Sequence, residues 1–229
     1  MEFMLDSANL AELKHGCEYY PVDGITTNPS ILKAEIPINY FEHLKAIKEI
    51  AGEGTFHVQL GKMTFEEMVE EAKTIWAELG KDVYLKIPVT EEGVKTIKWV
   101  KANGGRVTAT SIYYTFQGIM AIQAGADYLA PYCNRMNNND IDFYSAISQL
   151  RQLIDRDGYN SKILAASFKS VAQVTQAIEA GAHAVTIQPA LLKTAMHSAL
   201  VTDAVAAFAY KRGIGTDIDI FVAAQHCRF

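Results

Sequence analysis

The stretch Val83–Pro88, which reads VYLKIP, decides how the chain is interpreted. Five residues that favour burial surround a single lysine, and alternation along a strand places Tyr84, Lys86 and Pro88 on the same side. A buried ammonium is costly unless it is compensated, and lysine is also the amine with which enzymes form Schiff bases. The strand alone therefore leaves three possibilities open: a buried ion pair, a lysine that reaches water at the strand end, and a catalytic amine.

The composition is that of an ordinary globular protein. The chain has 229 residues, of which 49% are hydrophobic and 21% charged, so it can bury a sizeable core. A net charge of -5 without a Lys/Arg run argues against nucleic-acid binding, and no stretch has the roughly 20 apolar residues of a membrane helix. Its start lacks the pattern of a signal peptide. Cys17, Cys133 and Cys227 fit neither disulfide nor metal spacing. We expect a cytoplasmic protein with no metal, nucleic-acid or membrane partner.

Eight short strand-like runs alternate with longer segments of helical spacing. The runs are Glu2–Asp6, Val22–Thr26, Thr55–Leu60, Asp82–Pro88, Arg106–Thr110, Asp127–Pro131, Lys162–Ala166 and His183–Ile187. Strict alternation implies parallel strands joined by right-handed crossovers. Eight units favour a closed barrel over an open sheet. An open sheet of this class would also have a glycine-rich phosphate turn after the first strand, and DSANL at that position contains no glycine. The sequence therefore predicts an α/β fold, a single (β/α)8 TIM barrel.

Helical patterns are clearest in four of the intervening segments. These are Phe65–Leu79, Thr90–Ala102, Phe143–Ile154 and Val171–Ala180. Thr64 with Glu67 three residues later is typical of a helix start, and the pairs Gly125–Ala126 and Gly181–Ala182 are placed to end a helix before a strand.

The last part of the chain goes beyond the eight units. One more helical pattern lies near Asp203–Lys211, and an apolar segment follows at Ile218–Ala224. Exposed apolar residues on a ninth element indicate an interaction surface. We therefore expect one domain over residues 1–229, in which residues 200–229 form a C-terminal extension that packs on a neighbouring subunit.

Polar residues lie at or just beyond the carboxyl ends of seven of the eight runs. They are Asp6, Thr26 with Asn28, Gln59, Lys86, Thr110, Tyr132 and Ser167. Each alone has a simple structural explanation as a cap, a turn residue or a strand former. In a TIM barrel, however, the carboxyl ends of the strands meet at one mouth, where the working residues lie. A ring of polar groups around a lysine at this mouth therefore predicts an active site.

A lysine in that mouth predicts Schiff-base chemistry on a ketose. Its amine would attack the carbonyl to give an iminium, which accepts electrons when the neighbouring carbon–carbon bond breaks. Asp6 would take the proton of the hydroxyl that becomes the aldehyde, and Tyr132, with Gln59 and Thr110, would hold a water for proton transfer.

Two positions near the mouth favour a phosphate-bearing substrate. Arg135, just beyond the sixth run, offers a fork suited to phosphate. Ser167 and the start of the next helix, expected from Lys169 onward, would supply a second contact after the seventh strand, a common phosphate position in this fold.

Five motifs resemble those of the small transaldolase-like family, which includes the fructose-6-phosphate aldolases. In the family's order they read FMLDSA at the start, GITTNPSIL at 24–32, YLKIPVTEEG at 84–93, GADYLAPYCNR at 125–135 and ILAASFKS at 163–170. The resemblance implies a (β/α)8 barrel with class I Schiff-base chemistry and no metal or organic cofactor. It implies that Lys86 is the Schiff-base lysine and Asp6 the acid/base.

The resemblance also implies how the substrate is held. Thr26 and Asn28 would orient substrate hydroxyls, and Arg135 and Ser167 would bind the phosphate. Relatives form pentameric rings, often doubled, through a C-terminal helix, so a homo-oligomer is expected. The final stretch DIDIFVAAQHCRF matches no family pattern, and Asn134 precedes Arg135 where relatives often have glycine.

Two activities of the family share the lysine, and two positions separate them. Transaldolases resemble one another in having glutamate and phenylalanine where this chain has Gln59 and Tyr132, whereas fructose-6-phosphate aldolases have glutamine and tyrosine. The Asn-x-Thr pattern of transaldolases is also absent, because Thr108 precedes Ala109 and Thr110. We therefore expect cleavage of fructose 6-phosphate. The alternatives are a transaldolase and a barrel that binds phosphosugars without turnover.

Overall fold

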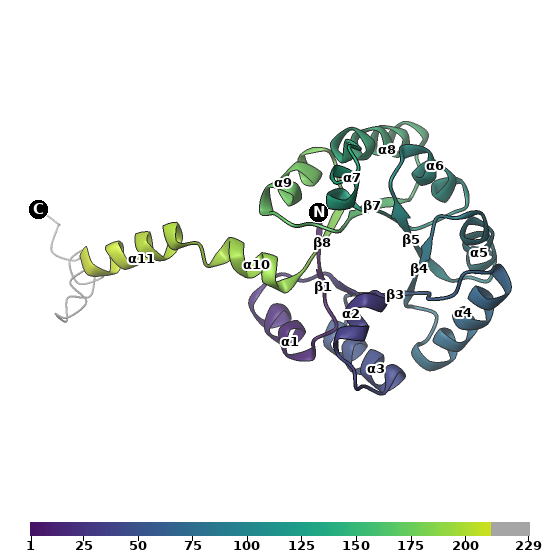
Figure 1. Cartoon of the computed structure of the whole chain (residues 1–229), viewed down its shortest axis with the longest axis horizontal. Helices are drawn as coiled ribbons and strands as arrows, with labels where there is room; N and C mark the ends of the chain where they lie inside the picture. The colour runs from purple at the N-terminus through teal and green to yellow at the C-terminus, as the bar shows by residue number, and fades with distance from the viewer. Residues whose placement is uncertain (212–229) are drawn as a thin grey trace, which may run out of the picture. The chain divides into compact units, whose positions relative to one another are not determined.

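The computed structural model describes residues 1–211, and eight strands lie within that range. They are β1 Glu2–Asp6, β2 Gly24–Thr26, β3 Thr55–Gln59, β4 Tyr84–Pro88, β5 Arg106–Ile112, β6 Tyr128–Pro131, β7 Lys162–Ala165 and β8 Ala184–Ile187. Each strand pairs in parallel with the next, and β8 pairs with β1, so the sheet closes into a barrel (Figure 1). The predicted (β/α)8 barrel is confirmed.

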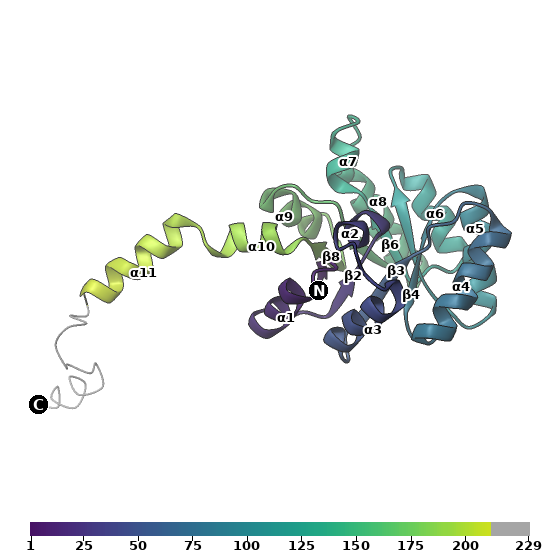
Figure 2. The same cartoon turned by 60° about the horizontal axis from the view of Figure 1, so that its bottom comes forward.

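Helices follow the strands along the chain, and those up to Glu179 surround the barrel (Figure 1). They are α1 Leu10–Tyr19, α2 Pro29–Ala34, α3 Tyr40–Ala51, α4 Phe65–Leu79, α5 Glu91–Ala102, α6 Thr115–Gln123, α7 Cys133–Asn137, α8 Phe143–Asp157, α9 Val171–Glu179, α10 Pro189–Met196 and α11 Ala199–Lys211. The short helix α7 projects beyond the larger helices of the ring (Figure 2). Residues of α2 and α7, which follow β2 and β6, line the mouth of the barrel.

Local signals in the sequence set the ends of several helices. Thr64 accepts a hydrogen bond from the Glu67 amide and begins α4, as predicted. Gly125 and Gly181 have φ of 91° and 102°, a region that a residue with a Cβ rarely adopts, and they follow the ends of α6 and α9. The helix after β7 begins at Val171 and is capped by Ser170, so the start of the predicted pattern Val171–Ala180 is confirmed. The start from Lys169 onward, expected for the phosphate contact, was wrong by two residues.

Alternation along β4 separates two environments. Leu85 and Ile87 are fully buried outside the barrel wall, whereas the ring of Tyr84 stacks on the ring of His57 inside it, with centroids 4.6 Å apart. Lys86 occupies the next inward position above Tyr84 and is 5% exposed. The sequence pattern of VYLKIP therefore places this lysine in the barrel interior, near the carboxyl ends of the strands.

The chain divides into two compact units, Met1–Leu191 and Leu192–Phe229. The first contains the barrel. In the second, α11 exposes Leu200, Val201, Val205 and Phe208, which are at least 49% exposed. The predicted apolar segment Ile218–Ala224 lies outside the described residues. Within residues 1–211, no helix is long and apolar enough to cross a membrane.

Candidate active site

A cavity of about 530 Å³ opens at the carboxyl ends of the strands. Seven of the nine residues predicted from the sequence line it: Asp6, Asn28, Gln59, Lys86, Tyr132, Arg135 and Ser167. Thr26 and Thr110 do not line it, but both are fully buried and bonded to residues that do. The described structure therefore brings the predicted residues to one place, as the convergence of strand ends requires.

Lys86 reaches this cavity from the barrel wall. Its Nζ donates a hydrogen bond of 2.9 Å to the backbone carbonyl of Thr27, just beyond the end of β2. Lys86 and Gln59 are paired across β3 and β4, so their side chains are neighbours on the inner face. The side chain is thus held by a neutral carbonyl partner in a nearly dry position, and it borders open space.

Asp6 lies at the end of β1 and takes part in a chain of hydroxyl groups. Thr26 Oγ1 donates to Asp6 Oδ1 at 2.7 Å and lies 2.8 Å from Thr186 Oγ1. Burial raises the pKa of Asp6, and the positive charge of Lys86 and the Thr26 hydrogen bond oppose that rise. A carboxyl group with a raised pKa beside an amine is suited to proton transfer.

A second hydrogen-bonded pair joins Thr110 on β5 to Tyr132 just after β6, and Tyr132 lines the cavity. Thr110 Oγ1 donates a hydrogen bond of 2.9 Å to the Tyr132 phenol oxygen. Gln59 Oε1 is buried without a protein hydrogen-bond partner. An unpartnered acceptor next to a cavity is a natural place for a water or a substrate hydroxyl. These side chains fit the predicted water-holding role, which stays a prediction.

The outer part of the cavity carries positive charge. The Arg135 guanidinium lies 4.9 Å from the centroid of the Tyr132 ring, and its interaction with the Tyr113 phenol raises the pKa of Arg135. Lys169 also lines the cavity, and Ser167 has φ of 63°, a strained conformation that is frequent at functional sites. The arrangement suits an anionic group at this end of the cavity.

The cavity is also lined by polar residues that the sequence did not single out, among them Thr186, Gln188 and Ser111. Thr186 lies on β8 and Gln188 just after it, at the eighth strand end, for which no polar residue was predicted. The same rule applied to HAVTIQ would have found them. Ser111, with φ of 59°, lies where the register of β5 and β6 shifts, and no sequence pattern marks this bulge.

A polar layer lies inside the barrel, one inward position below Gln59 on β3. His57 is fully buried, with Nδ1 2.8 Å from Thr108 Oγ1 and Nε2 2.9 Å from Thr55 Oγ1. Burial and the charge of Lys86 hold the pKa of His57 well below its usual value. The imidazole is therefore neutral, and its two nitrogens are satisfied by hydroxyl groups.

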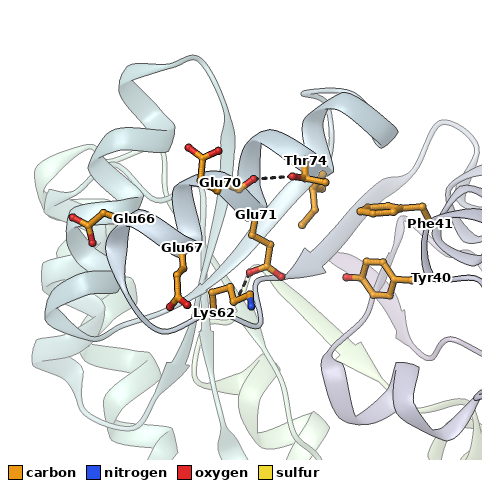
Figure 3. A pocket seen from close by; sticks show the side chains of 9 residues that line it. Tyr40, Phe41, Lys62, Glu66, Glu67, Glu70, Glu71 and Thr74 are labelled. Atoms are coloured by element: carbon orange, nitrogen blue, oxygen red, sulfur yellow. Dashed lines mark hydrogen bonds between the residues drawn. The ribbon is translucent and has the colours of Figure 1, made fainter.

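Another hollow, of about 540 Å³, lies between α3 and α4 and has a different character (Figure 3). Its lining includes Glu66, Glu67, Glu70 and Glu71, with one lysine, Lys62. A wall with four carboxylates and one amine repels an anionic substrate. The barrel mouth, which carries Lys86, Arg135 and Lys169 against the carboxylate of Asp6, is the better candidate site.

A closed parallel barrel defines the TIM-barrel class, and the polar residues around Lys86 lie at the mouth where enzymes of this class have their active sites. Residues 3–224 match the family model described as transaldolase/fructose-6-phosphate aldolase, and the chain belongs to this family. A probable fructose-6-phosphate aldolase of Streptococcus pneumoniae is 51% identical over 187 residues, which cover 81% of this chain and 84% of the relative. A probable transaldolase of Streptococcus equi subsp. zooepidemicus is 36% identical over 208 residues, 91% of this chain and 96% of the relative. The resemblance inferred from the motifs is confirmed.

Proposed function

We propose that the protein is a class I aldolase that cleaves and forms fructose 6-phosphate, with dihydroxyacetone and glyceraldehyde 3-phosphate as the other partners. The observation that carries this proposal is Lys86, 5% exposed in the barrel and bordering a cavity that also contains Asp6 and Arg135. A binding site for a phosphosugar gains nothing from a desolvated amine beside a carboxyl group, whereas Schiff-base catalysis needs both.

The chemistry follows from the positions of these groups. The Lys86 amine attacks the ketone carbon, and loss of water gives an iminium. Asp6 takes the proton of the hydroxyl two carbons from the iminium carbon, and as the carbon–carbon bond breaks its electrons move into the iminium to form an enamine. Glyceraldehyde 3-phosphate leaves. Protonation of the enamine and addition of water, held by Tyr132 and Gln59, release dihydroxyacetone and restore the amine.

A coupled assay tests this proposal. Fructose 6-phosphate should yield glyceraldehyde 3-phosphate without an acceptor aldose, and Lys86→Met should abolish the release. Lys101→Met is a matched control, because Lys101 forms an ion pair of 2.7 Å with Asp127 away from the cavity. Release that persists in Lys86→Met would point to contaminating activity and to a barrel that only binds phosphosugars.

Transaldolase activity is the second candidate, supported by the relatives named probable transaldolases. In that reaction the enamine attacks a second aldose before water reaches it. Rapid transfer to erythrose 4-phosphate with negligible free dihydroxyacetone would establish this alternative. The cytoplasmic location and the homo-oligomeric state, pentamer or decamer, stay predictions.

A further inference from the structure

A buried hydroxyl on β8 completes the hydrogen-bond chain that ends on Asp6. Thr26 is fully buried and Thr186 is 3% exposed. Their hydroxyl oxygens are 2.8 Å apart, and Thr26 Oγ1 lies 2.7 Å from Asp6 Oδ1. The three residues stand on β8, β1 and β2, which are neighbours around the closed barrel. The contact between Thr186 and Thr26 therefore exists only because β8 returns to β1.

Counting protons gives this chain a direction. A threonine hydroxyl has one proton to donate, and Thr26 donates it to the Asp6 carboxylate. The bond between the two threonines therefore needs Thr186 as its donor and Thr26 as its acceptor. Thr186 thus fixes the rotation of the Thr26 hydroxyl, so that the proton of Thr26 stays directed at the Asp6 carboxylate.

Asp6 is surrounded by one charged group and several uncharged ones. The charged group that acts on Asp6 is Lys86 from β4. Thr26 from β2 and Thr186 from β8 are uncharged, as is Gln59 from β3, and His57 below it is held neutral. Without Thr186, the buried Thr26 oxygen would lose its donor, and its hydroxyl would be free to turn away from the carboxylate.

We propose that Thr186 is a positioning residue for the proton transfer, acting on Asp6 through Thr26. This inference rests on the proposed function, because it gives Asp6 the proton-accepting role in the cleavage step. Hydrogen bonds to a carboxylate favour its ionised form, the form that accepts a proton. The chain from Thr186 therefore keeps Asp6 both oriented and ionised against the desolvation that raises its pKa.

The test is Thr186→Val, which removes the hydroxyl and nearly keeps the volume. We expect kcat for cleavage of fructose 6-phosphate to fall about tenfold, the upper end for a lost hydrogen bond between neutral groups, with KM little changed. The acid limb of the pH profile of kcat/KM should move to higher pH, because the pKa of Asp6 rises further. Thr186→Ser, which restores the hydroxyl, should recover most of the rate and return the acid limb.

Two further variants separate positioning from a general loss of packing. Thr96→Val removes another fully buried hydroxyl, which donates to the Glu92 carbonyl at 2.7 Å within α5, and should leave the acid limb in place. Adding Thr186→Val to Thr26→Val should cost little more than Thr26→Val alone, because both act through one chain. An unmoved acid limb in Thr186→Val, or full additivity with Thr26→Val, would overturn the proposal.

Reductive trapping distinguishes a failure of the proposal for Thr186 from a failure of the proposed Schiff-base function. Parent and Thr186→Val should give similar amounts of borohydride-reduced adduct with dihydroxyacetone, because forming the iminium does not require the cleavage proton. An absent adduct in the parent would refute the Schiff-base function itself. If the parent forms the adduct and Thr186→Val does not, Thr186 is needed before the cleavage step. That result would contradict a role limited to the proton transfer.

Discussion

The hydroxyl of Thr110 donates its proton to the phenol oxygen of Tyr132 across 2.9 Å. Because the phenol oxygen accepts this bond, the phenol proton of Tyr132 is available to a water or substrate in the cavity, which Tyr132 lines. In the proposed reaction, we expect the fate of the enamine to depend on a water at this place. For dihydroxyacetone to be released, the enamine must be protonated and water must add to the resulting iminium. For the unit to be transferred, the enamine must instead attack the carbonyl of an aldose.

Tyr132→Phe removes that donor and should shift the reaction from cleavage toward transfer. We expect the ratio of free dihydroxyacetone to transferred product, measured with erythrose 4-phosphate present, to fall several-fold. Tyr144→Phe on α8, where the tyrosine is 44% exposed and away from the cavity, is the control. An unchanged ratio in Tyr132→Phe would show that the division between the two activities lies elsewhere.

Gln59→Glu places a carboxylate beside Lys86, its neighbour across β3 and β4. The buried Oε1 of Gln59 has no protein partner, so a charged group there would hold the proposed catalytic water differently. We expect this variant to favour transfer, and the double variant with Tyr132→Phe to favour it most. A double variant that still releases dihydroxyacetone at the parent ratio would contradict the assignment of both positions.

Arg135→Met should weaken the binding of phosphorylated substrate selectively. The guanidinium lies at the positively charged end of the cavity, and loss of a charge-assisted contact costs about 2 kcal/mol, or about 30-fold in KM for fructose 6-phosphate. Trapping with dihydroxyacetone, which has no phosphate, should change far less. Arg151→Met, which breaks an ion pair of 2.8 Å with Asp155 on α8, is the control. Equal losses with both substrates would argue against a phosphate site at Arg135.

The neutral His57 should make folding stability depend on pH. Its pKa is well below the unfolded value, so at mildly acidic pH the unfolded chain binds a proton at His57 and the folded chain does not. The contribution of the neutral His57 to the free energy of unfolding is fully present above the unfolded pKa of about 6.5. It falls as pH drops below that value, by at most about 1.4 kcal/mol per pH unit for one proton. His57→Gln should flatten this slope between about pH 7 and pH 5, as measured by denaturant unfolding. His15→Gln, at an exposed histidine, is the control.

The exposed apolar residues of α11 should support assembly. Val205→Glu with Phe208→Glu places charges where side chains are 62% and 68% exposed in one chain, and we expect light scattering to show smaller particles than for the parent. Ala206→Glu on another face of the same helix is the matched control. Particles of parent size in the double variant would show that this face does not join subunits.

The sequence was sufficient for the barrel and for most of the cavity. Strand-helix alternation and the polar residues at strand ends are local patterns, so Asp6, Lys86 and Tyr132 could be found without coordinates. The contact of Thr26 with Thr186 could not, because it joins residues 160 positions apart and depends on the closure of β8 against β1. The bulge that places Ser111 at the cavity is likewise a property of the paired strands.

His57 shows a different limit of the sequence. FHVQL predicts a strand, but its histidine could equally lie on the outer face or at a cap. Only the closed barrel brings Thr108 of β5 within 2.8 Å of the ring and satisfies a buried imidazole.

The central claim is that Lys86 forms the Schiff base, and reductive trapping tests it most directly. The protein is treated with borohydride in the presence of dihydroxyacetone, digested, and mapped by mass spectrometry. We expect one reduced three-carbon adduct, located on the peptide that contains Lys86, and none in Lys86→Met. The absence of an adduct in the parent, or an adduct on another lysine, would contradict the account.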